Sequence, residues 1–245
     1  MMAHFYAFSE TQDAEELHRM RVEIKKIFAL TALLELGTRN FDFSSCLNPL
    51  KTISMKTGEI RNIQLTLRTI IRYSGENSAV CELQKARLTN LIRIFCLKTA
   101  LYVKIFKKVR QSVLGEIYDI ENSCIFRWYE DELKKLSQFF TKKYDHKNIH
   151  EGRKILKKLL YVYAILQKPL QNKLNLNKHY LRKLEVTIGK WHDVTVSMEI
   201  LSRSNFTGNE AVKKLSDRKQ KLLRSCRELS KCFFEKCYKC DRENN

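Results

Sequence analysis

The chain has 245 residues, a length that suffices to bury a core without disulfide or metal support. Its composition, 44% hydrophobic and 30% charged residues, argues against a disordered chain. Its formal net charge of +19 predicts an anionic partner such as nucleic acid, an acidic membrane surface or a polyphosphate. Seven glycines and two prolines disfavour a turn-rich all-β fold, and no run of about 20 apolar residues could span a membrane.

The first half of the chain predicts four helices. Apolar residues recur at helical spacing over residues 13–36, and Gly37 follows as a C-terminal cap. A second helix carries Pro49 in its first turn, where proline is tolerated, and ends near Gly75. The next two predicted helices cover residues 80–113, with an end near Gly115, and residues 117–144.

Three more helices are predicted in the second half. The fifth covers residues 148–167 and is ended by Pro169, since proline cannot continue a helix. The sixth covers residues 176–202, and the seventh follows Gly208 and continues to about Lys239. No segment alternates as a strand would, so the predicted fold class is all-α.

A basic motif, H-x-x-R-x-x-x-K-K, occurs at His18 and again at His150, 132 residues later. On a helix, the histidine, the arginine and the first lysine of each copy fall on one narrow stripe beside an apolar face. Neither copy conserves a carboxylate in the motif, which indicates a polyanion site and points away from hydrolysis. The motif residues are His18, Arg21, Lys25 and Lys26 in the first copy and His150, Arg153, Lys157 and Lys158 in the second.

A second pair of motifs follows in the same order. The five residues from Gly58 to Asn62 match the five from Gly189 to Asp193, 131 residues later. Glycine inside a helix costs about 1 kcal/mol relative to alanine, so its presence at both positions predicts close approach of a neighbouring helix. Further basic residues on these helices extend the predicted anion site, namely Lys51, Arg61, Arg68, Arg72, Arg182, Lys183 and His192.

The two motifs recur in the same order and at nearly the same offset, which predicts an internal duplication. The chain 1–245 is then a single domain of two pseudo-symmetric antiparallel helical bundles, at residues 13–140 and 145–240, packed together. The basic residue types suit phosphate, because arginine offers a bidentate fork and lysine a point charge. A nearby polyanion also raises the pKa of histidine and makes it a second donor.

The doubled set of motifs, with Leu50-Lys51 ahead of Gly58, resembles the CHAD domain, the conserved histidine α-helical domain, over roughly residues 13–240. The resemblance implies two bundles around a basic central cleft that binds inorganic polyphosphate, and an association with polyphosphate granules. It implies as cleft residues His18, Arg21, Lys25, His150, Arg153 and Lys157, with Lys51, Arg61, Arg182 and His192 nearby. Asn62 departs from the family pattern, which often has aspartate there, whereas Asp193 keeps it.

Many CHAD domains sit beside a CYTH-type triphosphatase domain, and we expect no such domain in this chain. We therefore predict a stand-alone polyphosphate-binding protein that is not an enzyme and needs no cofactor. The eight scattered cysteines are interpreted as reduced thiols. With no secretory signal after Met1, they predict a cytoplasmic location.

Two other functions remain open. A nucleic-acid-binding protein would fit the charge equally well, although no helix-turn-helix, zinc-finger or RNA-binding motif is present. A phosphohydrolase acting on polyphosphate fits less well, because the repeated motifs lack carboxylates for Mg²⁺ and the His192-Asp193 pair has no further ligands suitably arranged.

Two features near the C-terminus belong to neither motif. The basic helix that contains Lys213 and Arg227 either covers the second bundle as a solvated surface or extends the polyanion track. Cys237 and Cys240 form a lone C-x-x-C, which we interpret as free thiols, since zinc would need two more ligands.

Overall fold

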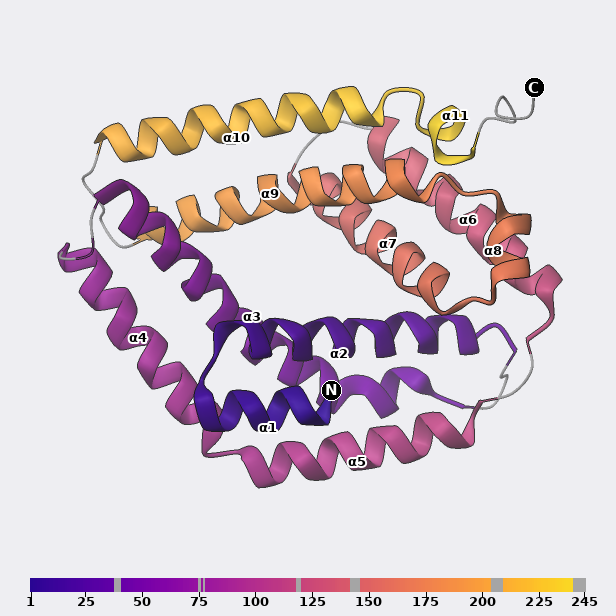
Figure 1. The fold of residues 1–245 in the computed structure, drawn as a ribbon, viewed down its shortest axis with the longest axis horizontal. Coiled ribbons are helices and arrows are strands. Elements are labelled where there is room, and N and C mark those ends of the chain that lie inside the picture. Colours follow the sequence, from indigo (N-terminus) through magenta and orange to yellow (C-terminus); the bar gives the residue numbers. More distant parts are fainter. Residues whose placement is uncertain are drawn as a thin grey trace.

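The computed structural model describes residues 1–37, 41–74, 76, 78–117, 120–141, 146–203 and 209–239 (Figure 1). In these ranges the chain is helical, with no strand beyond an isolated bridge between Leu176 and Tyr238, so the all-α prediction is confirmed. The helices are α1 (Met2–Thr11), α2 (Ala14–Leu34), α3 (Phe43–Ser74), α4 (Ala79–Cys96), α5 (Thr99–Gly115), α6 (Asn122–Thr141), α7 (His146–Ile165), α8 (Lys168–Leu174), α9 (Lys178–Arg203), α10 (Asn209–Ser230) and α11 (Phe233–Cys237).

Helices α1 to α5 enclose one apolar core. Phe5 of α1 is fully buried and meets Phe106 of α5 edge-on, with ring centroids 5.1 Å apart. α2 begins where the Asp13 carboxylate accepts a hydrogen bond from the Glu15 backbone N–H at 3.1 Å, and it buries Met20 against the same core. This core fixes the orientation of α2, which carries the first basic motif.

Helices α6 to α11 share a second core. Tyr129 of α6 is buried and donates a hydrogen bond to the backbone carbonyl of Leu159 in α7, at 3.1 Å. Phe233 of α11 packs against Phe140 of α6, with ring centroids 5.3 Å apart. The residues of α6 fall within the predicted first bundle, 13–140, yet their apolar side chains lie in the core of α7 and α9.

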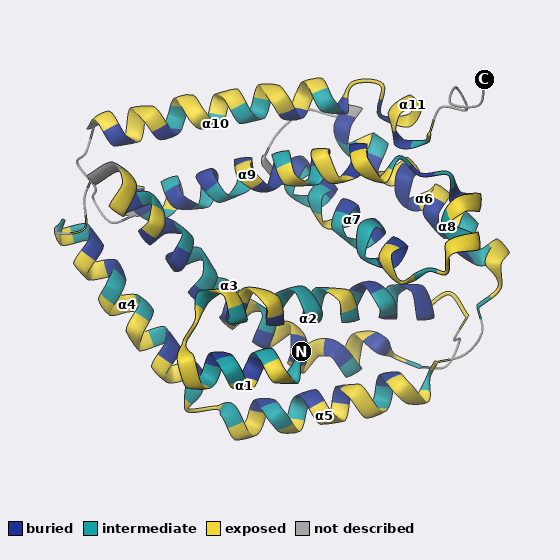
Figure 2. Ribbon diagram, in the orientation of Figure 1, coloured by how far each residue is buried: buried dark blue, intermediate teal, exposed yellow. Residues whose placement is uncertain are grey.

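The two groups of helices meet along α2 with α7 and along α3 with α9. Ala29 and Leu33 of α2 are buried in the second core. A third cluster joins Ile63 and Ile70 of α3 to Val194 of α9. Figure 2 shows buried residues along the facing sides of these helices and many exposed ones along the outer sides of α4, α5 and α10. The second copy of each motif therefore lies close to the first.

Several predicted helix boundaries were wrong in the first half. Helix α1 was not predicted, and the predicted helix over residues 80–113 is broken at Leu97 and Lys98. Leu97 fits the apolar pattern of a continuous helix although its side chain is 74% exposed. The pattern therefore did not indicate the break. Pro49 lies in the second turn of α3, because the helix already begins at Phe43.

The second half also differs from the prediction. Pro169 opens the short helix α8 and does not end the previous one, which stops at Ile165. The side-chain amide of Gln171 donates to the backbone carbonyls of Tyr163 and Leu166, at 2.9 and 2.8 Å, and so caps α7. The predicted seventh helix is broken at Cys232, whose φ of 51° is left-handed.

The predicted helix end near Gly75 and the predicted helix start after Gly208 lie at residues outside the described ranges. Gly115 is the last residue of α5, as predicted, and Gly37 lies in the turn that follows α2. Over the described ranges, no helix is both long enough and apolar enough to serve as a membrane span.

Candidate functional site

A pocket of about 450 Å³ opens between α2, α7 and α9, at the junction of the two cores. It combines residues of both copies of the basic motif with one residue of the second glycine motif. Two aromatic side chains, Phe28 and Tyr161, share its wall. The lining residues are Arg21, Lys25, Phe28, Ala29, His150, Arg153, Lys154, Lys157, Lys158, Tyr161 and His192.

Arg21 is held by the neighbouring helix α3. Its Nη1 donates hydrogen bonds to the Ser54 carbonyl at 2.7 Å and to Thr57 Oγ1 at 2.9 Å. The guanidinium crosses α3 at Gly58, where a β-carbon would lie 3.2 Å from Nη1. Burial, and secondly Arg61, lower the pKa of Arg21 to about 10. The close approach expected at this glycine is made by a side chain of α2.

Arg153 makes the corresponding contact in the second half. Its guanidinium crosses α9 at Gly189, where a β-carbon would lie 3.2 Å from Nη2. Here the partner is a carboxylate, because Arg153 Nη2 forms an ion pair with Glu185 Oε1 at 3.9 Å. Arg153 Nε is buried and has no hydrogen-bond partner among the described residues. The guanidinium is thus fixed in place but retains donor capacity.

The first lysines of the two motif copies face each other across the pocket. The pKa of Lys25 is lowered to about 7, first by burial and then by the charges of Lys157, Arg21 and Arg153. Burial and Arg153 also lower the pKa of Lys157, although its Nζ lies 3.2 Å from Glu185 Oε1. The carboxylate of Glu185 therefore offsets only part of the positive charge gathered here.

The histidines of the motifs occupy two different settings. His150 and His192 both line the pocket, and their rings lie 5.0 Å apart, tilted by 38°. His18 is exposed on α2, and the pKa of its ring is lowered by partial burial and by Arg61. Arg61 also acts on Asp193, whose pKa is raised by burial despite the opposing charges of its basic neighbours.

Lys158 lies at the rim of the pocket, against α6. It pairs with Glu132, a buried carboxylate, and its Nζ lies 5.4 Å from the centre of the Trp128 ring. Because the charge of Lys158 is already satisfied by Glu132, this lysine contributes less to an anion than Lys25 or Lys157 would.

The other predicted site residues lie elsewhere. Lys26 is exposed and pairs with Glu23 at 2.7 Å, and Lys51 bonds to Ser44 and Asn48 near the start of α3. Lys183 lines a different groove, between α9 and α10. The remaining residues that do not line the pocket are exposed or half-buried on α3 and α9, namely Arg61, Arg68, Arg72 and Arg182.

Sequence reasoning missed three features of the pocket. Tyr161 was interpreted as a packing residue, but its half-buried ring lines the wall, four residues after Lys157 and so on the same side of α7. Lys154 was not singled out, although it follows Arg153 directly. Glu185 has no counterpart in the motifs, so no sequence pattern indicated that it pairs with them.

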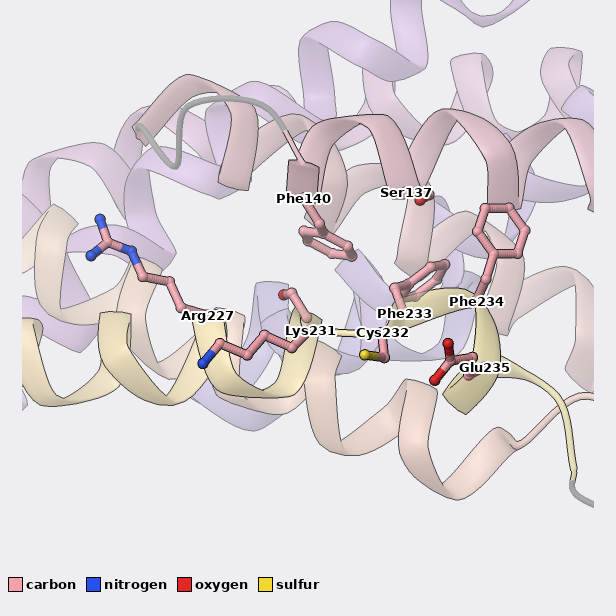
Figure 3. A pocket seen from close by; sticks show the side chains of 9 residues that line it. Ser137, Phe140, Arg227, Lys231, Cys232, Phe233, Phe234 and Glu235 are labelled. Atoms are coloured by element: carbon pink, nitrogen blue, oxygen red, sulfur yellow. The ribbon is translucent and has the colours of Figure 1, made fainter.

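A second pocket, of about 460 Å³, lies between α6, α10 and α11 (Figure 3). Figure 3 shows Phe140, Phe233 and the exposed Cys232 around it, with Arg227 extended away along α10. Cys226 and Cys237 are buried, and burial raises the pKa of both thiols to about 12. Cys240 lies outside the described residues. Over the described ranges, no three His, Cys, Asp or Glu residues are grouped as metal ligands would be.

Comparison of the chain with protein-family models, with curated proteins and with solved structures finds no match.

Proposed function

We propose that this protein binds inorganic polyphosphate, without cleaving it, in the pocket between α2, α7 and α9. The observation that carries the proposal is the meeting of Arg21 and Lys25 with Arg153 and Lys157, from helices far apart in the sequence. Burial first, and then the charges of Lys157, Arg21 and Arg153, lower the pKa of Lys25 to about 7. A bound polyanion would relieve that repulsion, so the electrostatic cost present without a ligand favours anion binding.

The paired arginine–glycine contacts support the proposal that the two halves arose by duplication and resemble the CHAD domain. Arg21 lies against Gly58 and Arg153 against Gly189, each 3.2 Å from the position of a β-carbon. Both arginines line one pocket and come from opposite halves of the chain. We include in the proposal the basic central cleft, the cytoplasmic location and the association with polyphosphate granules that the family resemblance implies.

A condensed phosphate chain suits this lining for chemical reasons. Arginine and lysine recognise phosphate oxygens without reading a base, and a flexible chain can adapt to cations spread over three helices. Binding through several such contacts should weaken steeply with salt, because counterions are released. Phe28 and Tyr161 could stack on a base, so nucleotides and RNA are the competitors to include.

The test is binding of the purified protein to long-chain polyphosphate at ~150 mM salt, with duplex DNA, RNA and ATP as competitors. We expect excess nucleic acid to leave the complex intact. Easy displacement by DNA or RNA would favour the nucleic-acid alternative. Phosphate release measured with and without Mg²⁺ separates binding from hydrolysis, and we expect none above background.

A matched pair of variants assigns the binding to the pocket. Arg21→Glu with Arg153→Glu should abolish polyphosphate binding in this pocket while the far-ultraviolet circular dichroism stays unchanged. The control, Lys104→Glu with Lys108→Glu, reverses the same number of charges at exposed positions of α5 and should retain binding. Full affinity in the Arg21/Arg153 variant would show that the ligand binds somewhere else.

A further inference from the structure

A third hollow, of about 760 Å³, runs between α9 and α10 on the outer side of the molecule. The two helices lie side by side in Figure 1 and run in opposite directions, since only residues 204–208 connect them. We call it the α9/α10 groove, and it is lined by Lys183, Thr187, Lys190, Lys221, Leu222, Arg224, Ser225, Glu228 and Leu229.

The charges in this groove are not neutralised. Over the described ranges, no ion pair and no side-chain hydrogen bond is made by the four cations Lys183, Lys190, Lys221 and Arg224. The one carboxylate in the lining, Glu228, pairs with Lys231 at 3.0 Å. Elsewhere on α10 the pattern differs, since Lys214 pairs with Glu210 at 2.6 Å. The groove therefore presents a concentrated positive field without a partner.

The spacing of the cations suits an extended anion. Lys183 and Lys190 are seven residues apart on α9, which places them on one face and about 10 Å apart along the axis. Lys221 and Arg224 are three residues apart on the facing helix, about 4.5 Å along its axis. The cations thus follow the length of the groove from both walls.

We infer that the α9/α10 groove is a second binding site for a condensed phosphate chain, separate from the central pocket. The inference rests on the proposed function for the class of ligand, but the groove is made of other residues. Lys190 and the pocket residue His192 lie two positions apart on α9, a rotation of about 200° around the helix axis. Their side chains therefore leave the helix on nearly opposite sides. The body of α9 therefore separates the two sites.

The lining favours phosphate without bases over the other polyanions. None of the residues that line the groove is aromatic, so a single-stranded nucleic acid would find no platform for stacking its bases. The cations are arranged around a hollow and not on a protruding apolar face, which disfavours a membrane surface. Lysine and arginine at several positions along a channel match the repeating charge of polyphosphate.

Two sites on one molecule predict a dependence on chain length. A short probe, tripolyphosphate, should occupy the two sites independently, whereas a chain long enough to pass around α9 should bind both at once. Linking the two contacts raises the local concentration at the second site. Loss of the groove should then weaken long-chain binding by about tenfold or more, while the central pocket still binds.

The experiment is isothermal titration calorimetry with tripolyphosphate and with long-chain polyphosphate on four proteins: the unmodified protein, the Arg21→Glu/Arg153→Glu variant, the groove variant and its control. The groove variant carries Lys183→Gln, Lys190→Gln, Lys221→Gln and Arg224→Gln, all at exposed positions. The control carries Lys56→Gln, Lys98→Gln, Lys104→Gln and Lys108→Gln, which remove the same charge from exposed positions on α3, α5 and the turn before α5. Circular dichroism checks folding, and Lys190→Gln with Arg224→Gln replaces the fourfold variant should it fail to fold.

We expect two tripolyphosphate sites in the unmodified protein and in the control, but one in the groove variant. Unchanged stoichiometry and long-chain affinity in the groove variant would overturn the inference and leave the proposed function standing. If the groove variant loses binding and the Arg21→Glu/Arg153→Glu protein keeps it, the result would support the groove and reject the central pocket. An unmodified protein that binds neither probe would overturn both.

Discussion

At the scale of single residues, Lys25 is the side chain whose chemistry the fold alters most clearly. Burial and the charges of Lys157, Arg21 and Arg153 lower its pKa to about 7, with Glu185 acting in the opposite direction. Near neutral pH a fraction of the protein therefore carries a neutral amine there. An arriving polyanion would favour the ammonium form, so binding should be accompanied by proton uptake.

The sign of the pH effect on stability follows from this depressed pKa. Below about pH 7 the ammonium is charged in the folded and unfolded states, and the folded state carries the full cost of burying that charge. Above the ordinary lysine pKa of 10.5 that cost is gone. Without ligand, stability from Lys25 should thus rise with pH over this window. Lys25→Met should stabilise the protein more at about pH 6.5 than at about pH 9.5, measured by urea unfolding. A stability difference that does not change with pH would contradict this.

At the scale of helices, the two glycines that face the arginines offer a test that separates affinity from stability. A β-carbon at Gly58 would lie 3.2 Å from Arg21 Nη1, and one at Gly189 equally close to Arg153 Nη2. Alanine would favour each helix by about 1 kcal/mol but push the guanidinium aside by a few tenths of an ångström.

We therefore expect Gly58→Ala and Gly189→Ala to change the free energy of unfolding by no more than about 1 kcal/mol while they weaken polyphosphate binding. Gly115→Ala is the matched control, because a β-carbon there meets nothing within 4 Å. The two readouts are chemical unfolding and calorimetric titration. Equal affinities in all three variants would mean that the arginine positions do not matter for the ligand.

Comparison of the predicted helices with the observed ones shows which parts of the fold could be predicted from the sequence. The 3.6-residue apolar period correctly indicated an all-helical chain, and it located most of α2, α7 and α9. It could not indicate the break at Leu97, because an exposed leucine there continues the period. Pro169 has two meanings in a sequence, a helix stop or a first-turn residue, and only the capping by Gln171 decides between them.

Only part of the candidate pocket could be predicted from the sequence. The repeated motifs named Arg21, Lys25, Arg153 and Lys157, which line one pocket. The motif could not separate them from Lys26, which is next to Lys25 in sequence but turned to solvent and paired with Glu23. The role of these residues in polyphosphate binding stays a prediction.

At the scale of the whole molecule, the two groups of helices are joined by shared cores. Leu33 of α2 is 5% exposed and lies in the same cluster as residues of α6, α7 and α9. Leu33→Ala should cost about 2–5 kcal/mol, through lost burial and a cavity. Both tryptophans, Trp128 and Trp191, lie in the second core, as the side chain of Leu33 does, so their fluorescence reports on the core that loses this contact.

We expect the Leu33→Ala variant to unfold in one transition, with tryptophan fluorescence and far-ultraviolet circular dichroism shifted to the same lower denaturant midpoint. That result requires energetic coupling between the halves. Val22→Ala, at a half-buried position of α2, serves as a comparison of smaller effect. A shift in fluorescence with part of the circular dichroism transition left at its original midpoint would mean that the halves unfold separately.

The burial of Ala29 and Leu33 of α2 beneath α6, α7 and α9 also has a consequence for synthesis on the ribosome. These residues are made early, whereas Leu181 and Leu184 of the same cluster follow about 150 residues later. At roughly 5–20 residues per second, the interval lasts on the order of 10–30 s. During that time part of the apolar face of α2 lacks its partners from α9, which leaves this face exposed to other apolar surfaces while the chain is being made.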